Sequence, residues 1–404
     1  MITEDAFTQR VREFLTAHAR SKDDLGDDES VAGDAVTTTK AFQRALTDAG
    51  LAGLTYPVEY GGQGLTRAYQ EIFTREAAPY VLPTRAITIS HGMCLPILND
   101  FGTAEQKARH LPKIISADEI WCQMFSEPGA GSDVASLQTR AELDGDEWVI
   151  NGQKVWTSGA QFCDFGLCLA RTNVDVPKHE GISMFVVDMR AAGVDIRPLR
   201  QITGDADFNE IFFTDVRLPR WSVVGELNRG WNVAVAMLMY ERVALGAGGS
   251  GPMASRRFDR LVEIARATSR SHEPTTRQAL ADFYIRETIF RYVGMRIRDA
   301  LKAGRAPGPE GSIAKLASAQ LAVLGANVAA AMAGPAAVAW PADSHGGDQI
   351  ARGVLGAPAI GIAGGTNEVQ HNIIAERVLG LPKEPSADKG VAFKDLRVGT
   401  QRRG

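Results

Sequence analysis

The sequence predicts an α+β fold in which helices, an antiparallel β domain and a helical bundle follow one another. The hydrophobic periodicity changes from helical to alternating near Trp121 and becomes helical again from Trp231. A chain of 404 residues is also too long for one ordinary core. We therefore expect an N-terminal helical domain over residues 1–120, a middle β domain over residues 121–225 and a C-terminal helical domain over residues 226–404.

The N-terminal part has the spacing of amphipathic helices. Apolar residues recur at helical intervals in FQRALTDAGLAGL, and YPVEYGGQGL (residues 56–65) then interrupts the pattern with Pro57 and three glycines. Two further segments, QEIFTREAA and AEQKARHLPKII, continue the helical set.

The middle part has the pattern of strands and tight turns. RAELDGDEWVINGQKVWTSG contains alternating runs with a turn predicted at Asp144-Gly145 and a second at Asn151-Gly152. GISMFVVDM and NEIFFTDVRLP extend the strand set. From Trp231 to about residue 380 the pattern is helical, with Gly and Pro near residues 246–252 and 306–312.

Composition narrows the class of protein. With 45% hydrophobic and 23% charged residues, the chain is typical of soluble globular proteins, and a net charge of −4 gives no support for nucleic-acid binding. The four cysteines and seven histidines lack metal-ligand spacing, so we expect a reducing compartment and no metal. The N-terminus has no signal-peptide pattern, which favours a cytoplasmic protein.

One stretch has the length of a membrane span. LAVLGANVAAAMAGPAAVAW, residues 321–340, is rich in Ala and Gly, is interrupted by Pro335 and continues a soluble-looking helix. We expect a close-packed helix inside an oligomer and no membrane partner.

Two stretches of the β domain are candidate ligand sites. In WCQMFSEPGAGSDVASLQT, residues 121–139, a strand runs into glycines and hydroxyl residues that suit a polar planar ring or a phosphate, although composition alone favours a plain loop. In KVWTSGA, residues 154–160, a tryptophan beside two hydroxyls fits either a stacked ligand ring or an ordinary core.

Two stretches of the bundle are also candidates. Residues 233–245 are apolar except for Glu241 and Arg242, so no face of this helix is predicted to be solvated, and the carboxylate is either a salt-bridge partner or a general base. AGGTNEVQ, residues 363–370, is either an anion-binding loop or a plain turn that Thr366 or Asn367 caps.

Taken in order, FSEPGAGSD, WTSG after INGQK, GSIAKL, and GGTNEVQ followed by IIAERVLGLP resemble the acyl-CoA dehydrogenase family. The resemblance implies a β-barrel-like middle domain, a C-terminal four-helix bundle and bound FAD. It also implies lipid degradation by α,β-dehydrogenation of an acyl-CoA thioester to the trans-2-enoyl-CoA. A carboxylate removes the α proton, the β hydride passes to flavin N5, and an electron-transfer flavoprotein accepts the electrons.

The same resemblance assigns roles residue by residue. Contacts to the cofactor are implied for Phe125, Ser126, Gly131, Ser132, Trp156, Thr157, Ser158, Gly365, Thr366 and Glu368. Contacts to the substrate are implied for Ser132, for Arg242 near the thioester and for Gly364, whose backbone N–H would bond the thioester carbonyl.

This chain departs from the commonest family pattern at the base. Many members carry the base as a glutamate at the position of Gly364, and glycine cannot accept a proton. Isovaleryl-CoA-type members carry it in a Glu-Arg pair on the helix before the bundle, where MYERVAL places Glu241. We therefore predict Glu241 as the base, since burial raises a carboxyl pKa toward neutrality. The missing side chain at Gly364 would leave room for a bulky acyl group.

A second departure concerns the segments with which a neighbouring subunit grips the FAD. Family members have Arg-x-x-Phe-Gly and Gln-x-x-Gly-Gly-x-Gly, whereas this chain has ATSRSHEPTTRQ and AMAGPAAVAW, with Arg270 or Arg277 as a substitute arginine. The resemblance implies a homotetramer or dimer. The departures leave two alternatives: a half-catalytic or non-catalytic subunit of a hetero-oligomer, and a flavin oxidase or monooxygenase on the same fold.

Overall fold

The computed structural model describes residues 2–22, 35–246, 257–303, 308–339, 347–386 and 388–396. The chain forms two compact units. Unit 1 comprises Met1–Arg200, Ala206–Tyr240 and Ala387–Gly404, and unit 2 comprises Gln201–Asp205 and Glu241–Ser386.

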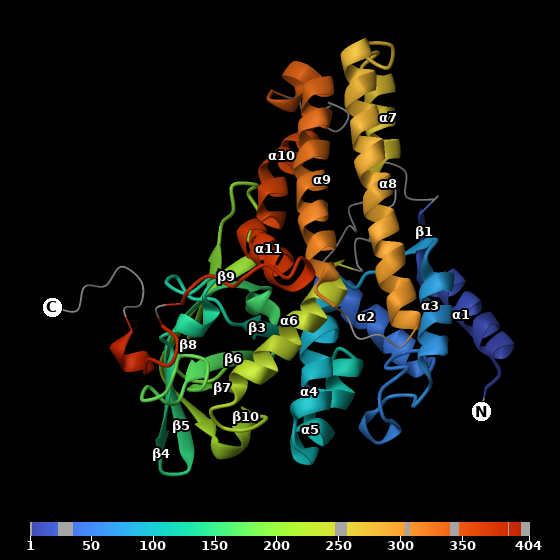
Figure 1. The fold of residues 1–404 in the computed structure, drawn as a ribbon. Coiled ribbons are helices and arrows are strands. Elements are labelled where there is room, and N and C mark those ends of the chain that lie inside the picture. Colours follow the sequence, from blue (N-terminus) through green and yellow to red (C-terminus); the bar gives the residue numbers. More distant parts are fainter. Residues whose placement is uncertain are drawn as a thin grey trace. The chain divides into compact units, whose positions relative to one another are not determined.

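The N-terminal part of unit 1 is helical, as the periodicity predicts (Figure 1). Its helices are α1 (Glu4–His18), α2 (Ala35–Asp48), α3 (Arg67–Ala77), α4 (Leu95–Phe101) and α5 (Ala104–Ile115), with a π-helical turn at Ser90–Cys94. Thr103 and Gln106 form a capping box that begins α5. Two short strands, β1 (Arg20–Ser21) and β2 (Tyr80–Val81), pair within this part and were not predicted.

The middle part of unit 1 is an eight-stranded sheet in the order β10-β7-β6-β4-β5-β9-β8, with β3 beside β6. Its strands are β3 (Trp121–Met124), β4 (Arg140–Asp144), β5 (Glu147–Ser158), β6 (Phe165–Arg171), β7 (Ile182–Asp188), β8 (Val194–Leu199), β9 (Phe208–Pro219) and β10 (Val223–Val224). Most pairs are antiparallel, but β3 and β4 pair with β6 in parallel.

One predicted turn is present and the other is wrong. Asp144 pairs with Glu147 across the turn that contains Gly145, so the first hairpin is confirmed. Asn151 and Gly152 instead lie inside β5, at a shift of its register against β9. Gly152 has φ 149° and a side chain there would collide with Thr139, while Asn151 exchanges hydrogen bonds with Asp215 at 3.0 and 2.9 Å. The glycine therefore serves a bulge and a close backbone approach.

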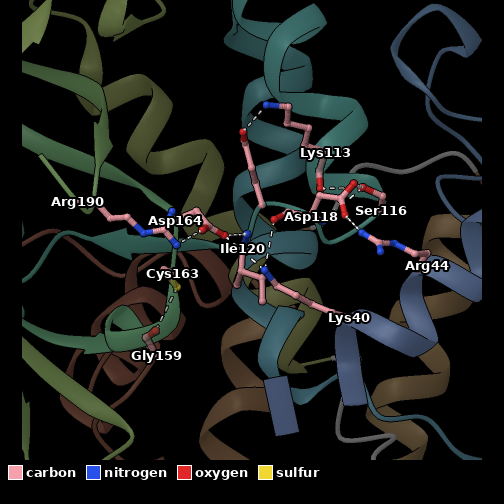
Figure 2. A network of polar contacts seen from close by, with 11 residues as sticks. Lys40, Arg44, Lys113, Ser116, Asp118, Ile120, Gly159, Cys163, Asp164 and Arg190 are labelled. Atoms are coloured by element: carbon pink, nitrogen blue, oxygen red, sulfur yellow. Dashed lines mark hydrogen bonds and ion pairs between the residues drawn. The ribbon is translucent and has the colours of Figure 1, made fainter. Parts of the chain in front are cut away.

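A polar network joins the N-terminal helices to the sheet (Figure 2). The carboxylate of Asp164 accepts the Ile120 N–H at 3.0 Å and an Arg190 guanidinium N–H at 2.6 Å, and it lies 3.8 Å from Lys40 on α2. Asp118, after α5, bonds both Ser116 and Arg44. The chain that enters β3 is thus held from α2, α5 and β6.

The helical part of unit 2 is a bundle, as predicted. It contains α7 (Arg257–Ala267), α8 (Pro274–Lys302), α9 (Glu310–Ala333), α10 (Gly347–Ile360) and α11 (Asn367–Ile373), followed by a π-helical turn at Ile374–Val378. α6 (Gly230–Gly246) runs from unit 1 into unit 2. The predicted Gly and Pro breaks near 246–252 and 306–312 fall partly outside the described residues.

Within the described ranges, α9 is the one helix whose length and composition would allow it to cross a membrane. It packs beside α7, α8, α10 and α11, and Leu321, Val328 and Met332 belong to the core of the bundle. Of its most apolar window, 28% is buried inside the single chain.

Candidate active site

The SEPGAGSD segment follows β3 directly and lies against the second candidate stretch. The Ser126 carbonyl accepts the Val155 N–H at 2.9 Å, which brings the two stretches together. Phe125 is buried, with 4% of its surface exposed, and Ser126 is half-buried. Five residues of the following loop are exposed: Pro128, Gly129, Gly131, Ser132 and Asp133. A polar loop with accessible backbone groups therefore lies beside β5.

A buried ion pair fixes the base of this loop. Lys154 Nζ donates to Glu127 Oε1 at 2.8 Å and to the Phe125 carbonyl at 3.1 Å, and its side chain has 0% exposure. The Glu127 carboxylate also accepts the backbone N–H groups of Gln138 and Thr139 at 2.6 and 2.9 Å. Burial would raise the pKa of Glu127, but Lys154 and these hydrogen bonds outweigh it and lower that pKa.

The WTSG segment bulges out of the end of β5. Trp156 has φ 62°, Gly159 has φ 67°, and the β5–β9 register shifts between Lys154 and Thr157. Trp156 has 60% of its residue surface exposed, Ser158 is half-buried and Thr157 is 1% exposed. A hydrogen bond from Asn209 fixes the backbone of the segment, since Asn209 Nδ2 donates to the Thr157 carbonyl at 3.0 Å. The segment therefore presents a tryptophan face outward on a fixed backbone.

Glu241 lies in α6, in the part of the helix that belongs to unit 2, and is half-buried. Arg242 lies in the same helix, and its side chain is outside the described part of the structure. The prediction that no face of α6 is solvated is wrong for the single chain, since Val235 and Met239 expose 43% and 37% of their surface. Val235 and Met239 are four residues apart and therefore lie on the same face of the helix, which is exposed in the single chain.

The AGGTNEVQ segment is a turn that leads into α11. Thr366 caps the helix by accepting the Val369 N–H at 3.2 Å, so the predicted cap is confirmed. Gly364 and Gly365 have φ 67° and 92°, values that favour glycine. The Gln370 amide donates to the carbonyls of both glycines, at 3.1 and 3.2 Å. It thereby fixes the peptide planes that carry the N–H groups of Gly365 and Thr366.

A lysine outside the predicted set lies near this turn. Lys315, in the GSIAKL motif of α9, has a buried Nζ without a hydrogen-bonding partner among the described residues. Burial lowers its pKa, and the charge of Glu368 in the first turn of α11 opposes that effect. Because an unpaired buried ammonium is costly, an anionic ligand would stabilise this site.

These features fit a dinucleotide flavin. An exposed indole beside half-buried Ser126 and Ser158 suits a planar polar ring, and side chains at Gly129 or Gly131 would meet nothing within 4 Å, so a ligand has room to approach the backbone there. Within unit 2, taken by itself, the buried Lys315 Nζ has no hydrogen-bonding partner among the described residues, and its charge would suit a phosphate.

The fold and these features together define a class of protein. Models for the three parts of acyl-CoA dehydrogenases match this chain in order: the N-terminal domain over residues 3–118, the middle domain over residues 122–216 and the C-terminal domain over residues 228–379. The chain therefore belongs to the acyl-CoA dehydrogenase family, a family of oxidoreductases, and the predicted fold class is confirmed.

Individual relatives agree with this assignment over most of the chain. Acyl-CoA dehydrogenase IpdE1 of Mycobacterium tuberculosis is 40% identical over 87% of this chain and 90% of its own length, and IpdE1 of Mycolicibacterium smegmatis is 36% identical over 95% and 99%. The solved structure named Tcur3481-Tcur3483 steroid ACAD has a TM-score of 0.78 at 30% identity and covers 95% of this chain and 99% of its own. The ChsE4-ChsE5 complex from Mycobacterium tuberculosis has a TM-score of 0.73 at 29% identity, with the same coverage.

Sequence reasoning missed the residues that hold the candidate site in shape. Lys154 and Gln370 lie inside candidate stretches and Lys315 lies in the GSIAKL motif, but the sequence assigns none of them a role. Asn209 lies outside these stretches and contacts one of them. A signal is present only in part for Lys154, because a lysine followed directly by Val155 and Trp156 in a strand needs a partner if it is buried. That partner is Glu127, in the candidate stretch of residues 121–139.

Proposed function

We propose that this chain catalyses the FAD-dependent α,β-dehydrogenation of an acyl-CoA thioester to the trans-2-enoyl-CoA, with Glu241 as the base that removes the α proton. The observation that carries the choice of base is the backbone of Gly364. At φ 67° an L side chain is strained, so this position is built for glycine and not for a glutamate. Glu241, half-buried on an apolar helix, is the carboxylate that remains for the task.

Each residue has a defined part in the proposed chemistry. FAD, when bound, supplies the two-electron acceptor for the β hydride. The residues that would hold it are Phe125, Ser126, Gly131, Ser132, Trp156, Thr157, Ser158, Gly365, Thr366 and Glu368. Thr157 is 1% exposed, so it would contribute through its backbone.

The substrate would be held through its thioester. The Gly364 N–H donates to the thioester carbonyl and stabilises the negative charge that develops when the α proton leaves. Arg242 and Ser132 are the further substrate contacts. The carboxylate of Glu241 accepts the proton, and a general base of this kind contributes about 10²–10⁴-fold to the rate.

Glu241→Gln tests the base. The variant is expected to keep its FAD and its fold but to lose flavin bleaching by acyl-CoA under anaerobic conditions. Glu263→Gln on α7 is the matched control, since Glu263 pairs with Arg260 on the surface at 3.3 Å and should leave bleaching unchanged. Bleaching of Glu241→Gln at the wild-type rate would rule out Glu241.

We infer a bulky, ring-containing acyl group as the substrate. One structural relative at 30% identity is named a steroid ACAD, and Gly364 removes a side chain from the position where the family commonly has a glutamate. A panel of CoA thioesters with linear, branched and steroid-type acyl groups should show the fastest bleaching with the steroid type. Preference for a linear chain would contradict this substrate class.

We also propose that a homologous partner chain completes the FAD site. Arg270, one of the two arginines that could serve a neighbour's FAD, is engaged within its own chain: Nη1 donates to the Ala331 carbonyl at 3.1 Å and Nε lies 4.0 Å from Glu273 Oε1. Glu273 lines the same pocket of about 280 Å³ as Arg270, and its charge repels a phosphate. In a homo-oligomer, the segment around Arg270 would therefore bind the FAD of a neighbouring subunit weakly.

Relatives support this proposal, because two of the solved structures named above consist of two different chains by name. Glu273→Phe combined with Pro274→Gly restores the spacing Arg-x-x-Phe-Gly after Arg270. The double variant, purified alone, is expected to retain more FAD than the wild type does alone. Full FAD occupancy and substrate bleaching by the wild-type chain alone would overturn the need for a partner.

For the electrons we propose an electron-transfer flavoprotein in the cytoplasm as acceptor. A flavin oxidase or monooxygenase on the same fold would instead consume oxygen after substrate reduction. Rapid oxygen uptake by the substrate-reduced protein would favour that alternative, and slow uptake with fast reoxidation by an electron-transfer flavoprotein favours the dehydrogenase.

A further inference from the structure

The last described segment of the chain, residues 388–396, folds back onto the β domain and belongs to unit 1. We call it the C-terminal strap. It lies beyond residue 379, where the match to the C-terminal family domain stops. An antiparallel bridge joins Ala392 to Pro177, and the Phe393 N–H donates to the Val176 carbonyl at 2.9 Å. The strap thus lies along the segment that connects β6 to β7.

Phe393 is the apolar anchor of the strap. Its side chain is buried, with 6% of the residue exposed, and the guanidinium carbon of Arg171 lies 3.6 Å from the centre of its ring. This distance is well inside the range of a cation–π contact. Arg171 is itself 3% exposed, so the ring covers a desolvated charge.

Arg171 in turn holds the chain that follows the GAGSD motif. Its Nη2 donates to the Ala135 carbonyl at 2.6 Å and to the Leu137 carbonyl at 3.4 Å, and its Nη1 donates to the Lys178 carbonyl at 2.5 Å. A buried guanidinium with these partners fixes the path of residues 135–137, because each lost partner would leave a buried polar group unsatisfied.

Lys178 forms a second link between the strap and the same loop. Its Nζ lies 2.8 Å from Asp133 Oδ2 and 2.5 Å from Asp388 Oδ2, and its side chain is 13% exposed. Burial would lower the pKa of Lys178, but the two carboxylates outweigh this and raise that pKa. One ammonium is therefore shared by the strap and by the residue that directly follows Ser132.

We propose that the C-terminal strap is a positioning element for residues 131–137, the segment that contains Ser132, a proposed contact to the acyl-CoA. Phe393 acts through Arg171 and Asp388 acts through Lys178, so both are positioning residues that do not touch the ligand. This inference rests on the proposed function for the identity of the ligand. The positioning itself rests on the contacts of the strap.

Phe393→Leu in the full-length protein tests the positioning, because leucine keeps an apolar cover and removes the aromatic face. Hydrogen exchange of the peptide that covers residues 131–139, without added ligand, is expected to become about tenfold faster. The dissociation constant for acyl-CoA should rise by a similar factor. Phe393→Trp, which restores an aromatic face, should recover both.

Phe212→Leu is the matched control, since Arg197 lies over the Phe212 ring at 4.4 Å in the same β domain and makes no link to the strap. It should leave exchange of residues 131–139 unchanged. Unchanged hydrogen exchange of residues 131–139 in Phe393→Leu would overturn the positioning role of the strap. Faster exchange with unaltered acyl-CoA affinity would show that the positioning does not affect acyl-CoA binding. A wild-type protein that binds no acyl-CoA would contradict the proposed function instead, and the exchange result would still decide the role of the strap.

Discussion

Lys154→Met should destabilise the protein more than most single substitutions, because it leaves Glu127 as a buried carboxylate without its ammonium partner. The Lys154 side chain is fully buried and the Nζ–Oε1 distance is 2.8 Å. Removing one partner of such a pair typically costs about 3–5 kcal/mol of unfolding free energy. The two backbone N–H groups that still bond Glu127 favour the lower end of that range.

Chemical denaturation measures this cost, and its pH dependence identifies the cause. In the wild type the pKa of Glu127 is lowered, so the pair stabilises the fold above the ordinary carboxyl pKa and loses that effect as the pH falls through the lowered value. In Lys154→Met, burial is left to raise the pKa of Glu127. The carboxyl can then bind a proton as the pH falls, and the difference from the wild type should shrink.

Two further variants make the test decisive. Lys154→Met combined with Glu127→Gln removes both charges and should be more stable than Lys154→Met alone. Glu147→Gln, in the exposed pair with Arg217 at 3.0 Å, should change stability little. A cost below about 1 kcal/mol for Lys154→Met, at a pH where Glu127 is ionised, would refute the assignment of a buried, essential pair.

Two other predictions follow from single residues. Burial lowers the pKa of His91 to about 4, so the unfolded state binds a proton first and stability should fall by up to about 3 kcal/mol as the pH drops from about 6.5 to about 4. His91→Asn should flatten that slope in denaturation curves taken across the range. Gly365→Ala places a Cβ 2.6 Å from Gln370 Nε2 at φ 92°, and should cost about 1–3 kcal/mol by the same measurement, whereas an unchanged midpoint would contradict the geometry.

Much of the fold follows from local patterns in the sequence. The change of periodicity near Trp121 locates the β domain, and Asp144-Gly145 specifies the first hairpin because the turn depends on neighbouring residues only. Asn151-Gly152 has the same local signal and yet lies in a bulge. The difference comes from Thr139 and Asp215, which are distant in sequence and close in space.

The residues of the candidate site also fall into two groups: those that the local sequence predicts and those that depend on contacts distant in sequence. Thr366 could be predicted as a helix cap because capping is local, whereas Asn209 under Thr157 and Phe393 under Arg171 depend on tertiary contacts. The resemblance to acyl-CoA dehydrogenases implies roles for the residues proposed to contact the flavin. It implies none for the C-terminal strap, which lies beyond the matched C-terminal domain. Residues that position others cannot be recognised from the sequence, because their residue types are common and only their contacts in the folded chain distinguish them.

Exchange of the substrate α proton with deuterated solvent tests directly whether Glu241 is the base. A CoA thioester in which sulfur replaces the β carbon cannot lose a β hydride, so exchange reports proton abstraction alone. The FAD-loaded protein, with its partner chain if it needs one, is expected to exchange the α proton, and Glu241→Gln is expected to lose that exchange while it still binds the thioester. Exchange by Glu241→Gln at the wild-type rate would show that another group removes the α proton.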